Sequence, residues 1–297
     1  MSNIIERLRE DIQLRGLSKN TEEEYINRVN VFLHWAGKPA EDMDEQDIRQ
    51  FLKYLINERQ LSVSSVNIHN SALRFLYAVT LNRNLNYRQI PRLKQIRRLP
   101  GILTKEEIGN IFEACDNLKH RAILMTIYGS GLRLSEIAKL KVSDIDSKSM
   151  RIFVNQGKGG KDRYSILSQT NLEVLRDYWK KFRPKEWLFE GVAPGGHISK
   201  RAVQDAFKKW KRIANIEKPA SIHTLRHCFA SHLLEADTNL FHIKKLLGHT
   251  HIQSTTFYLH LANFDANLKS PLDSLTPNPK KRRGRKPKKK SEVLVHA

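Results

Sequence analysis

Apolar residues recur at helical spacing through the first 80 residues of the chain. Between residues 21 and 35 the stripe consists of Tyr25, Val29, Phe32 and Leu33. A second stripe, at i, i+3, i+4 and i+7, consists of Ile48, Phe51, Leu52 and Leu55. Thr21 and Glu24 have the spacing of a capping box, and a further helix is expected from Ser62. The pattern predicts a small four-helix domain over residues 1–82.

A basic segment without helical periodicity follows, over residues 83–102. It contains two prolines, Pro91 and Pro100, and no acidic residue. Composition alone also fits a solvated tether, whereas the position between two domains favours a strand that crosses a phosphate backbone. We therefore expect a linker whose contacts with DNA come from Arg92, Lys94, Arg97 and Arg98.

One short section of the remaining chain is rich in β-forming residues. The runs 151–155 and 163–167 flank a glycine- and lysine-rich turn, which predicts a β-hairpin with Lys158 and Lys161 near its tip. Long helices are expected around it, the first from Thr104, which opens a second capping-box pattern. The prediction is a mainly α fold with a small β-sheet (α+β), whose second domain spans residues 103–272.

The charge of the chain narrows the class of partner. Lysine and arginine number 52 against 31 acidic residues, which gives a formal net charge of +21 with histidine neutral. Such an excess favours a polyanion, with nucleic acid ahead of an anionic membrane or an acidic protein. Residues 273–297 hold nine basic residues against two acidic ones, and we expect this tail to be disordered.

Cysteine content and hydropathy exclude other classes. Cys115 and Cys228 form no CxxC pair, so a disulfide scaffold or a cysteine-rich zinc site is not expected. No apolar run approaches the roughly 18 residues that cross a bilayer. We expect a cytoplasmic protein with no membrane partner.

Two segments before residue 160 carry groups suited to phosphate chemistry. Residues 128–136 place Arg133 after two glycines, where a helix start and a guanidinium can both meet a phosphoryl oxygen, and Glu136 follows one turn later. In the hairpin turn, Lys158 is a reasonable general acid for a departing alkoxide. Taken singly, a surface arginine and a solvated lysine are the ordinary explanations.

Two later segments add imidazoles, a guanidinium and a phenol. His223 and Arg226 share a helix face, L-L-G-H ends at His249, and S-T-T-F-Y ends at Tyr258. His223 and His227 also have the spacing of a zinc-binding pair, but a threonine replaces the expected glutamate, so no metal is expected. A lone tyrosine is usually a packing residue.

Together these segments resemble the tyrosine recombinase, or phage integrase, family. The motifs are G-L-R-L-S-E, G-K-G, H-T-L-R-H, L-L-G-H and S-T-T-F-Y, in that order. The similarity covers about residues 5–270, and the layout is most similar to Xer-type and integron-type recombinases. It implies an N-terminal core-binding (SAM-like) DNA-binding domain and a C-terminal catalytic domain that close round duplex DNA.

The resemblance also implies a reaction. Tyr258 would attack the scissile phosphodiester and form a 3′-phosphotyrosyl link, which conserves bond energy, so neither ATP nor a cofactor is needed. Arg133 and Arg226 would clamp the non-bridging oxygens in place of a metal ion. Glu136 would support the site.

The remaining groups would handle protons and phosphate oxygens. By resemblance His223 would assist proton transfer at the tyrosine, Lys158 would protonate the 5′ leaving oxygen and His249 would donate to the phosphate. The family works as a tetramer on two duplexes with inverted repeats, and residues 259–272 would pass to a neighbouring protomer.

The sequence says less about which residues read the DNA bases and about the biological role. Base readers are expected on the helix from Ser62, through Asn67, His69, Asn70 and Arg74, although His69 and Asn70 fit a solvated surface equally well. The leading function is site-specific recombination for a mobile element. Alternatives are Xer-like dimer resolution, relaxation of supercoils in the manner of type IB topoisomerases, and a non-catalytic DNA-binding regulator.

Overall fold

The computed structural model describes residues 2–86, 88–95, 101–155 and 162–261, arranged in two compact units, Met1–Arg98 and Leu99–Ala297. Each unit has its own hydrophobic core. The basic tail, residues 273–297, and the segment 262–272 lie outside the described residues. Within the described ranges, no helix has the length and apolarity needed to cross a bilayer.

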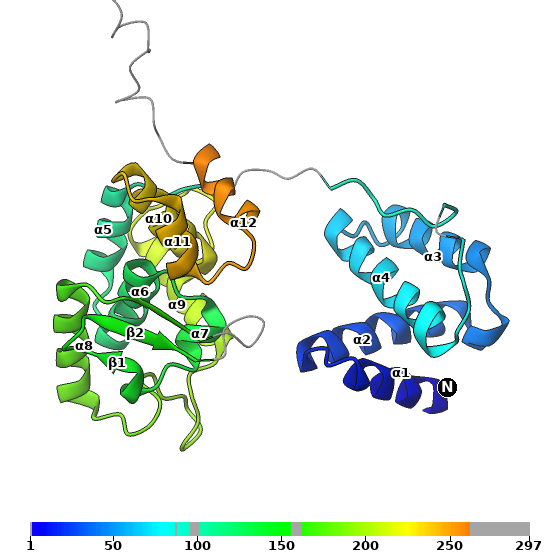
Figure 1. The fold of residues 1–297 in the computed structure, drawn as a ribbon, viewed down its shortest axis with the longest axis horizontal. Helices are drawn as coiled ribbons and strands as arrows, with labels where there is room; N and C mark the ends of the chain where they lie inside the picture. The colour runs from blue at the N-terminus through cyan, green and yellow to red at the C-terminus, as the bar shows by residue number, and fades with distance from the viewer. Residues whose placement is uncertain (1, 87, 96–100, 156–161, 262–297) are drawn as a thin grey trace, which may run out of the picture. The chain divides into compact units, whose positions relative to one another are not determined.

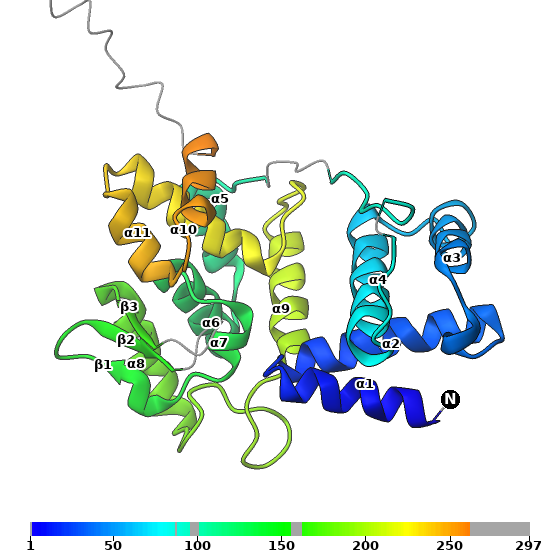
Figure 2. The same ribbon diagram turned by 45° about the vertical axis from the view of Figure 1, so that its right-hand side comes forward.

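The first unit contains the four helices that the sequence predicted. They are α1 (Ser2–Leu14), α2 (Lys19–Ala36), α3 (Glu45–Asn57) and α4 (Val63–Phe75), with a short 3-10 turn at Ala40–Asp42 and a π-helical turn at Leu76–Thr80. Helix α2 packs on both α1 and α4, and α3 packs on α4 (Figure 2). Both predicted stripes face this core, where Phe32 and Phe51 are fully buried.

Polar caps set the helix starts. Asp44 caps α3 and forms a capping box with Asp47, while Ser62 caps α4. The predicted capping box of Thr21 and Glu24 is wrong. Helix α2 begins at Lys19 because the Ser18 hydroxyl already accepts the backbone N–H of Thr21.

Three of the four expected base readers on α4, Asn67, Asn70 and Arg74, hold the segment that follows the helices. His69 and Asn70 are each 1% exposed, so both the base-reading and the solvated-surface interpretations of these two residues are wrong. The Asn70 amide donates to the carbonyls of Ile90 (3.3 Å) and Pro91 (3.1 Å). A buried amide whose hydrogen bonds are formed in this way stabilises an irregular segment that has no backbone hydrogen-bond ladder of its own.

Neighbouring side chains complete this clamp. Asn67 exchanges two hydrogen bonds of 2.9 Å with the backbone of Leu93, and Arg74 donates to Asn70 Oδ1 and to the carbonyl of residue 90. Residues 83–86 and 88–95 thus pack on the first unit, with Leu85 and Ile90 in its core. Arg92 and Lys94 are exposed, whereas residues 96–100, including Arg97 and Arg98, lie outside the described part.

The second unit is helical around one small sheet (Figure 1). Its longer helices are α5 (Lys105–Ala114), α6 (Leu118–Ser130), α8 (Gln169–Phe182), α9 (Lys200–Ile213), α10 (Ile222–Glu235) and α11 (Leu240–Leu247). The shorter ones are α7 (Leu134–Ala138), α12 (Gln253–Thr256) and the 3-10 turns Val142–Asp144 and Phe257–His260. The predicted capping box at Thr104 and Glu107 is confirmed.

The predicted hairpin is confirmed and gains a third strand. Strands β2 (Arg151–Val154) and β3 (Arg163–Ile166) pair antiparallel, with Val154 opposite Arg163. Strand β1 (Ile145–Asp146) adds to β2 in the order β1-β2-β3. Two residues are too short for an alternating pattern, which is why the sequence did not predict β1. Strand β3 is an edge strand, and α11 lies beside it.

Helix α10 organises the end of the unit that carries the predicted site. It packs on α6, α11 and the 3-10 turn 257–260. A small apolar cluster at this junction contains Phe229, Ile243, Leu247 and Tyr258. Gly131, with φ +61°, ends α6 against this cluster, and a Cβ there would lie 2.4 Å from the Phe229 ring. Only glycine therefore fits this close approach.

Candidate active site

Helix boundaries bring Arg133 and Arg226 to one place. Gly131 ends α6 in the left-handed conformation, so the chain turns and Arg133 becomes the N-cap residue of α7. Arg226, in the first turns of α10, is 6% exposed. One of its terminal nitrogens donates to the carbonyl of Gly131, and the other donates to Leu247 at 2.7 Å. The guanidinium of Arg226 thus joins α10 to the end of α6, which lies nearly a hundred residues earlier in the chain.

Glu136 lies between these arginines and a third, Arg163 from β3. Its carboxylate accepts Arg133 Nη1 at 2.7 Å and both terminal nitrogens of Arg163 at 2.8 and 2.7 Å. Arg226 Nη1 is 3.8 Å from the same carboxylate. Burial raises the pKa of Glu136, but the hydrogen bonds and charges of Arg163 and Arg133 outweigh it and lower that pKa to about 2. Glu136 is therefore ionised at neutral pH.

The arginines described around Glu136 carry more positive charge than its carboxylate can neutralise. Arg133, Arg163 and Arg226 face the single carboxylate of Glu136. Burial, and then repulsion from Arg133, lower the pKa of Arg226 to about 9. An added anion would relieve this repulsion, so the cluster is suited to bind a phosphate.

His249 follows α11, directly after the Gly248 that ends this helix. Its Nε2 is 3.4 Å from Arg226 Nη2, and its Nδ1 is 2.9 Å from the Thr255 hydroxyl. Burial and then the neighbouring Arg226 and Arg133 lower its pKa to about 4. The imidazole is therefore neutral at pH 7, and one of its nitrogens can donate without adding charge.

Tyr258 belongs to the 3-10 turn after α12 and is 2% exposed. Its ring stacks on that of His249, with centroids 6.3 Å apart and planes 8° apart. Its hydroxyl lies 3.2 Å from Nδ1 of His227. Burial raises the pKa of the phenol above its ordinary value, and the charges of Arg226 and Arg133 oppose this rise only in part. The tyrosine thus sits among the groups that the sequence singled out.

Sequence reasoning misses two residues of this site. The sequence suggests His227 only as part of a zinc pair, and Arg163 only as a strand residue. His227 contacts the phenol, whereas the His223 side chain is exposed and, within the described chain, has no hydrogen-bonding partner. No pattern in the neighbouring sequence marks Arg163 as a site residue, because an arginine in a strand is ordinarily exposed to solvent.

Other predicted residues are not placed. Lys158 and Lys161 fall in residues 156–161, outside the described part of the chain. Across the described ranges, no three histidine, cysteine, aspartate or glutamate side chains are grouped as a metal site.

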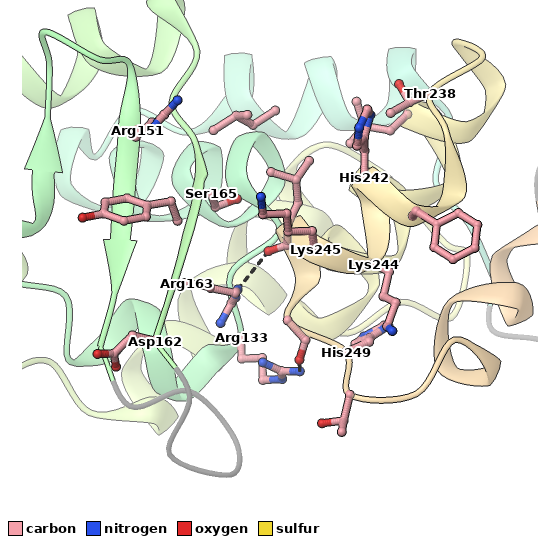
Figure 3. Close-up of a pocket in the computed structure, with 17 residues that line it drawn as sticks. Arg133, Arg151, Asp162, Arg163, Ser165, Thr238, His242, Lys244, Lys245 and His249 are labelled. Carbon is pink, nitrogen blue, oxygen red and sulfur yellow. Dashed lines mark hydrogen bonds between the residues drawn. The ribbon is translucent and has the colours of Figure 1, made fainter.

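A cleft opens next to the arginine cluster, between β3 and α11 (Figure 3). Its volume is about 1050 Å³. The charged side chains that line it are Arg133, Arg151, Arg163, Lys244, Lys245 and a single carboxylate, Asp162, and His249 lies at the same wall. In Figure 3, Arg133 and Arg163 both point toward the chain that ends α11. The described lining is strongly basic, as a surface for a polyanion requires.

Comparison with known proteins identifies the class. Residues 102–264 match the phage integrase family, and residues 4–87 match the phage integrase N-terminal SAM-like domain. The chain is 42% identical to the Sinorhizobium fredii protein y4qK over 280 residues, which is 94% of this chain and 91% of that protein. It is 32% identical to the tyrosine recombinase XerD of Chlorobaculum tepidum, over 83% of this chain and 88% of that protein.

Solved structures show the same fold. A lambda integrase dimer bound to a core site superposes with a TM-score of 0.71 at 19% identity, covering 87% of this chain and 94% of that chain. The fold and the site thus define a tyrosine recombinase. The chain belongs to the phage integrase family.

Proposed function

We propose that the protein cuts and rejoins duplex DNA at a specific site, with Tyr258 as the nucleophile. The phenolic oxygen attacks the scissile phosphorus, the bond to the 5′ oxygen breaks, and a 3′-phosphotyrosyl bond takes its place. The observation that carries this proposal is the position of the Tyr258 ring, which stacks on His249 beside the arginine cluster. A tyrosine that only fills space in the core would not need to lie beside a cluster of arginines.

In this mechanism Arg133 and Arg226 hold the non-bridging phosphate oxygens. The negative charge on these oxygens grows in the pentacoordinate transition state, so preorganised guanidinium donors stabilise it more than the ground state. Their own hydrogen bonds, to Glu136, Gly131 and Leu247, fix them before DNA arrives. His249 donates to the same phosphate as a neutral imidazole.

The phenol must lose its proton as the new bond forms. The family resemblance assigns this role to His223, whereas the contact of 3.2 Å supports His227 as the acceptor. Burial and the nearby Arg226 lower the pKa of His227, so its imidazole is neutral and able to accept a proton. Lys158 delivers a proton to the departing 5′ oxygen. Rejoining is the reverse of these steps.

Strand exchange requires two duplexes, so we infer that the working form is a tetramer on paired sites with inverted repeats. Among related folds, a lambda integrase tetramer has been solved on a Holliday junction, and XerH on its difH substrate. DNA contacts by Arg74, Arg92, Lys94, Arg97, Arg98 and Lys161 are part of this proposal. Phosphate contacts from the basic linker should make affinity fall steeply with salt.

Covalent trapping tests the nucleophile. The protein is incubated with DNA that flanks its own coding region, the denatured protein–DNA adducts are recovered and sequenced, and the site found is rebuilt as a nicked duplex. The wild type should accumulate an adduct on this duplex, and Tyr258→Phe should form none. Adduct formation by Tyr258→Phe would assign the nucleophile elsewhere, and no adduct with the wild type would favour a non-catalytic regulator.

The biological setting is tested separately, because integration and dimer resolution share this chemistry. We propose action on a mobile element. A site recovered at the ends of a discrete DNA element supports that role, whereas a single chromosomal or plasmid site supports Xer-like resolution. Relaxation of supercoiled DNA that lacks any recovered site would instead favour a topoisomerase-like activity.

A further inference from the structure

Arg163 is the arginine of the cluster that has no role in the mechanism above. It begins β3, yet its side chain is only 8% exposed. Its two terminal nitrogens form a bidentate pair with Glu136, at 2.8 and 2.7 Å. A buried guanidinium on an edge strand is costly unless all its donors are used.

The remaining side-chain nitrogen of Arg163, Nε, takes part in a set of hydrogen bonds at the end of α11. The carbonyl oxygens of residues 246–248 each accept a hydrogen bond from a different arginine. Arg163 Nε donates to the first at 2.8 Å, Arg226 Nη2 to the second at 2.7 Å, and Arg133 Nη2 to the third at 3.3 Å. The last carbonyls of a helix lack partners within it and carry partial negative charge, so cations stabilise them.

The absence of a side chain at Gly248 makes room for the arginine. Gly248 has φ +62°, and a Cβ there would lie 2.7 Å from Arg163 Cδ. The stem of Arg163 therefore passes directly against the turn that leads into His249.

We propose that Arg163 is a positioning residue for strand cleavage, which holds Glu136 against Arg133 and fixes the end of α11 from which His249 projects. The inference rests on the proposed function, since it concerns the same phosphate site. Arg163 itself need not touch the DNA. Its effect reaches the phosphate through Arg133, Arg226 and His249, which share its acceptors.

The electrostatics of Glu136 give this role a direct signature. Three charged groups face its carboxylate: Arg133 from the same helix start, Arg163 from β3 and Arg226 from α10. Removal of the bidentate partner should raise the pKa of the carboxyl, because burial is then less well opposed. A residue that only fills space would leave this titration unchanged.

The test compares Arg163→Met and Arg163→Lys with Arg176→Met, in the full chain on the nicked duplex recovered by covalent trapping. Arg176 is exposed on α8 and does not line the cleft, so its variant is a matched charge control. Arg163→Met should slow single-turnover adduct formation roughly 100-fold, as expected for a displaced catalytic group. The dissociation constant for DNA should change far less than this rate constant.

Carbon-13 titration of the Glu136 carboxyl, identified as the signal absent from Glu136→Gln, completes the test. The carboxyl should protonate at higher pH in Arg163→Met than in the wild type, and Arg163→Lys should reverse much of this shift. Arg163→Lys should still cleave slowly, because one ammonium cannot reach both carboxylate oxygens and the residue 246 carbonyl. Thermal unfolding shows which variants are folded.

Three outcomes would overturn the inference. They are adduct formation by Arg163→Met or Arg163→Lys at the wild-type rate, an unchanged Glu136 titration in a folded Arg163→Met, and an equal loss of rate in Arg176→Met. If Arg163→Met does not fold, the rate of Arg163→Lys decides. Failure of the wild type to form any adduct contradicts the proposed function instead, so the two failures are distinguishable.

Discussion

Nδ1 of His227 lies 3.2 Å from the hydroxyl oxygen of Tyr258, although 31 residues separate them in the chain. The preceding residue, Arg226, points away to the carbonyls of Gly131 and Leu247. Successive residues of an α-helix differ by about 100° in direction. A single turn of α10 therefore supplies both an anchor for phosphate and a partner for the phenol.

We predict that His227→Ala slows adduct formation more than His223→Ala does. Loss of a proton acceptor ordinarily reduces a rate by about 10²- to 10⁴-fold. Single-turnover trapping on the nicked duplex measures both variants against the wild type. The opposite order, with His223→Ala the slower variant, would return the proton-transfer role to His223.

The pH dependence of cleavage should reflect the same contact. The pKa of His227 is lowered from its usual 6.5, first by burial and then by Arg226. The imidazole therefore stays neutral, and able to accept a proton, at a pH where an ordinary histidine is charged. Adduct formation should persist below pH 6.5 and decline as the pH falls through the depressed pKa. A rate that is lost already above pH 6.5 would contradict this assignment.

Glu136→Gln should strongly destabilise the second unit. The substitution leaves the nearly buried side chains of Arg163 and Arg226, and the half-buried Arg133, without their carboxylate. Breaking a buried pair costs about 3–5 kcal/mol. Glu24→Gln is the matched control, because Glu24 forms an exposed pair with Arg28 worth about 0.5 kcal/mol. Urea unfolding of both variants at neutral pH measures the difference.

The same carboxylate predicts a dependence of stability on pH. Its folded-state pKa, about 2, lies below the ordinary 4.5, so its contribution is complete above 4.5 and is lost as the pH falls towards 2. Unfolding free energies of the wild type should decline through this window. If Glu136→Gln shows an equal decline over the same range, other carboxyls cause the effect.

Two glycines with the same backbone conformation should differ in their tolerance of alanine. Gly37 has φ +66°, and a Cβ added there would meet nothing within 4 Å, so Gly37→Ala should cost only the left-handed conformation, about 1 kcal/mol. Gly131→Ala adds a clash with Phe229 and should cost about 2–5 kcal/mol. Equal losses on urea unfolding would mean that Phe229 moves aside freely.

Asn70→Ala should loosen the segment that follows the first unit. The variant removes the donor to the carbonyls of residues 90 and 91 and an acceptor of Arg74, at an expected cost of about 1–3 kcal/mol. Ser64→Ala, at an exposed position of the same helix, should change stability by less than about 0.5 kcal/mol. Amide exchange of residues 88–95 should accelerate in Asn70→Ala alone. Unchanged protection there would show that the apolar contacts of Ile90 suffice.

Short-range patterns in the amino-acid sequence predicted the helical first unit, the hairpin and most of the chemical groups of the site, but not β1, His227 or Arg163. Helical spacing indicated the helices that became α2, α3 and α4, and two β-forming runs around a glycine turn indicated the β2–β3 hairpin, because these periodicities are properties of short segments. The order of motifs indicated the family. Folding in three dimensions decided which side chains meet, since that depends on contacts between distant segments. Asn70 turned inward to bind backbone carbonyls, His227 reached the phenol, and Arg163, ordinary in its strand, became the buried partner of Glu136.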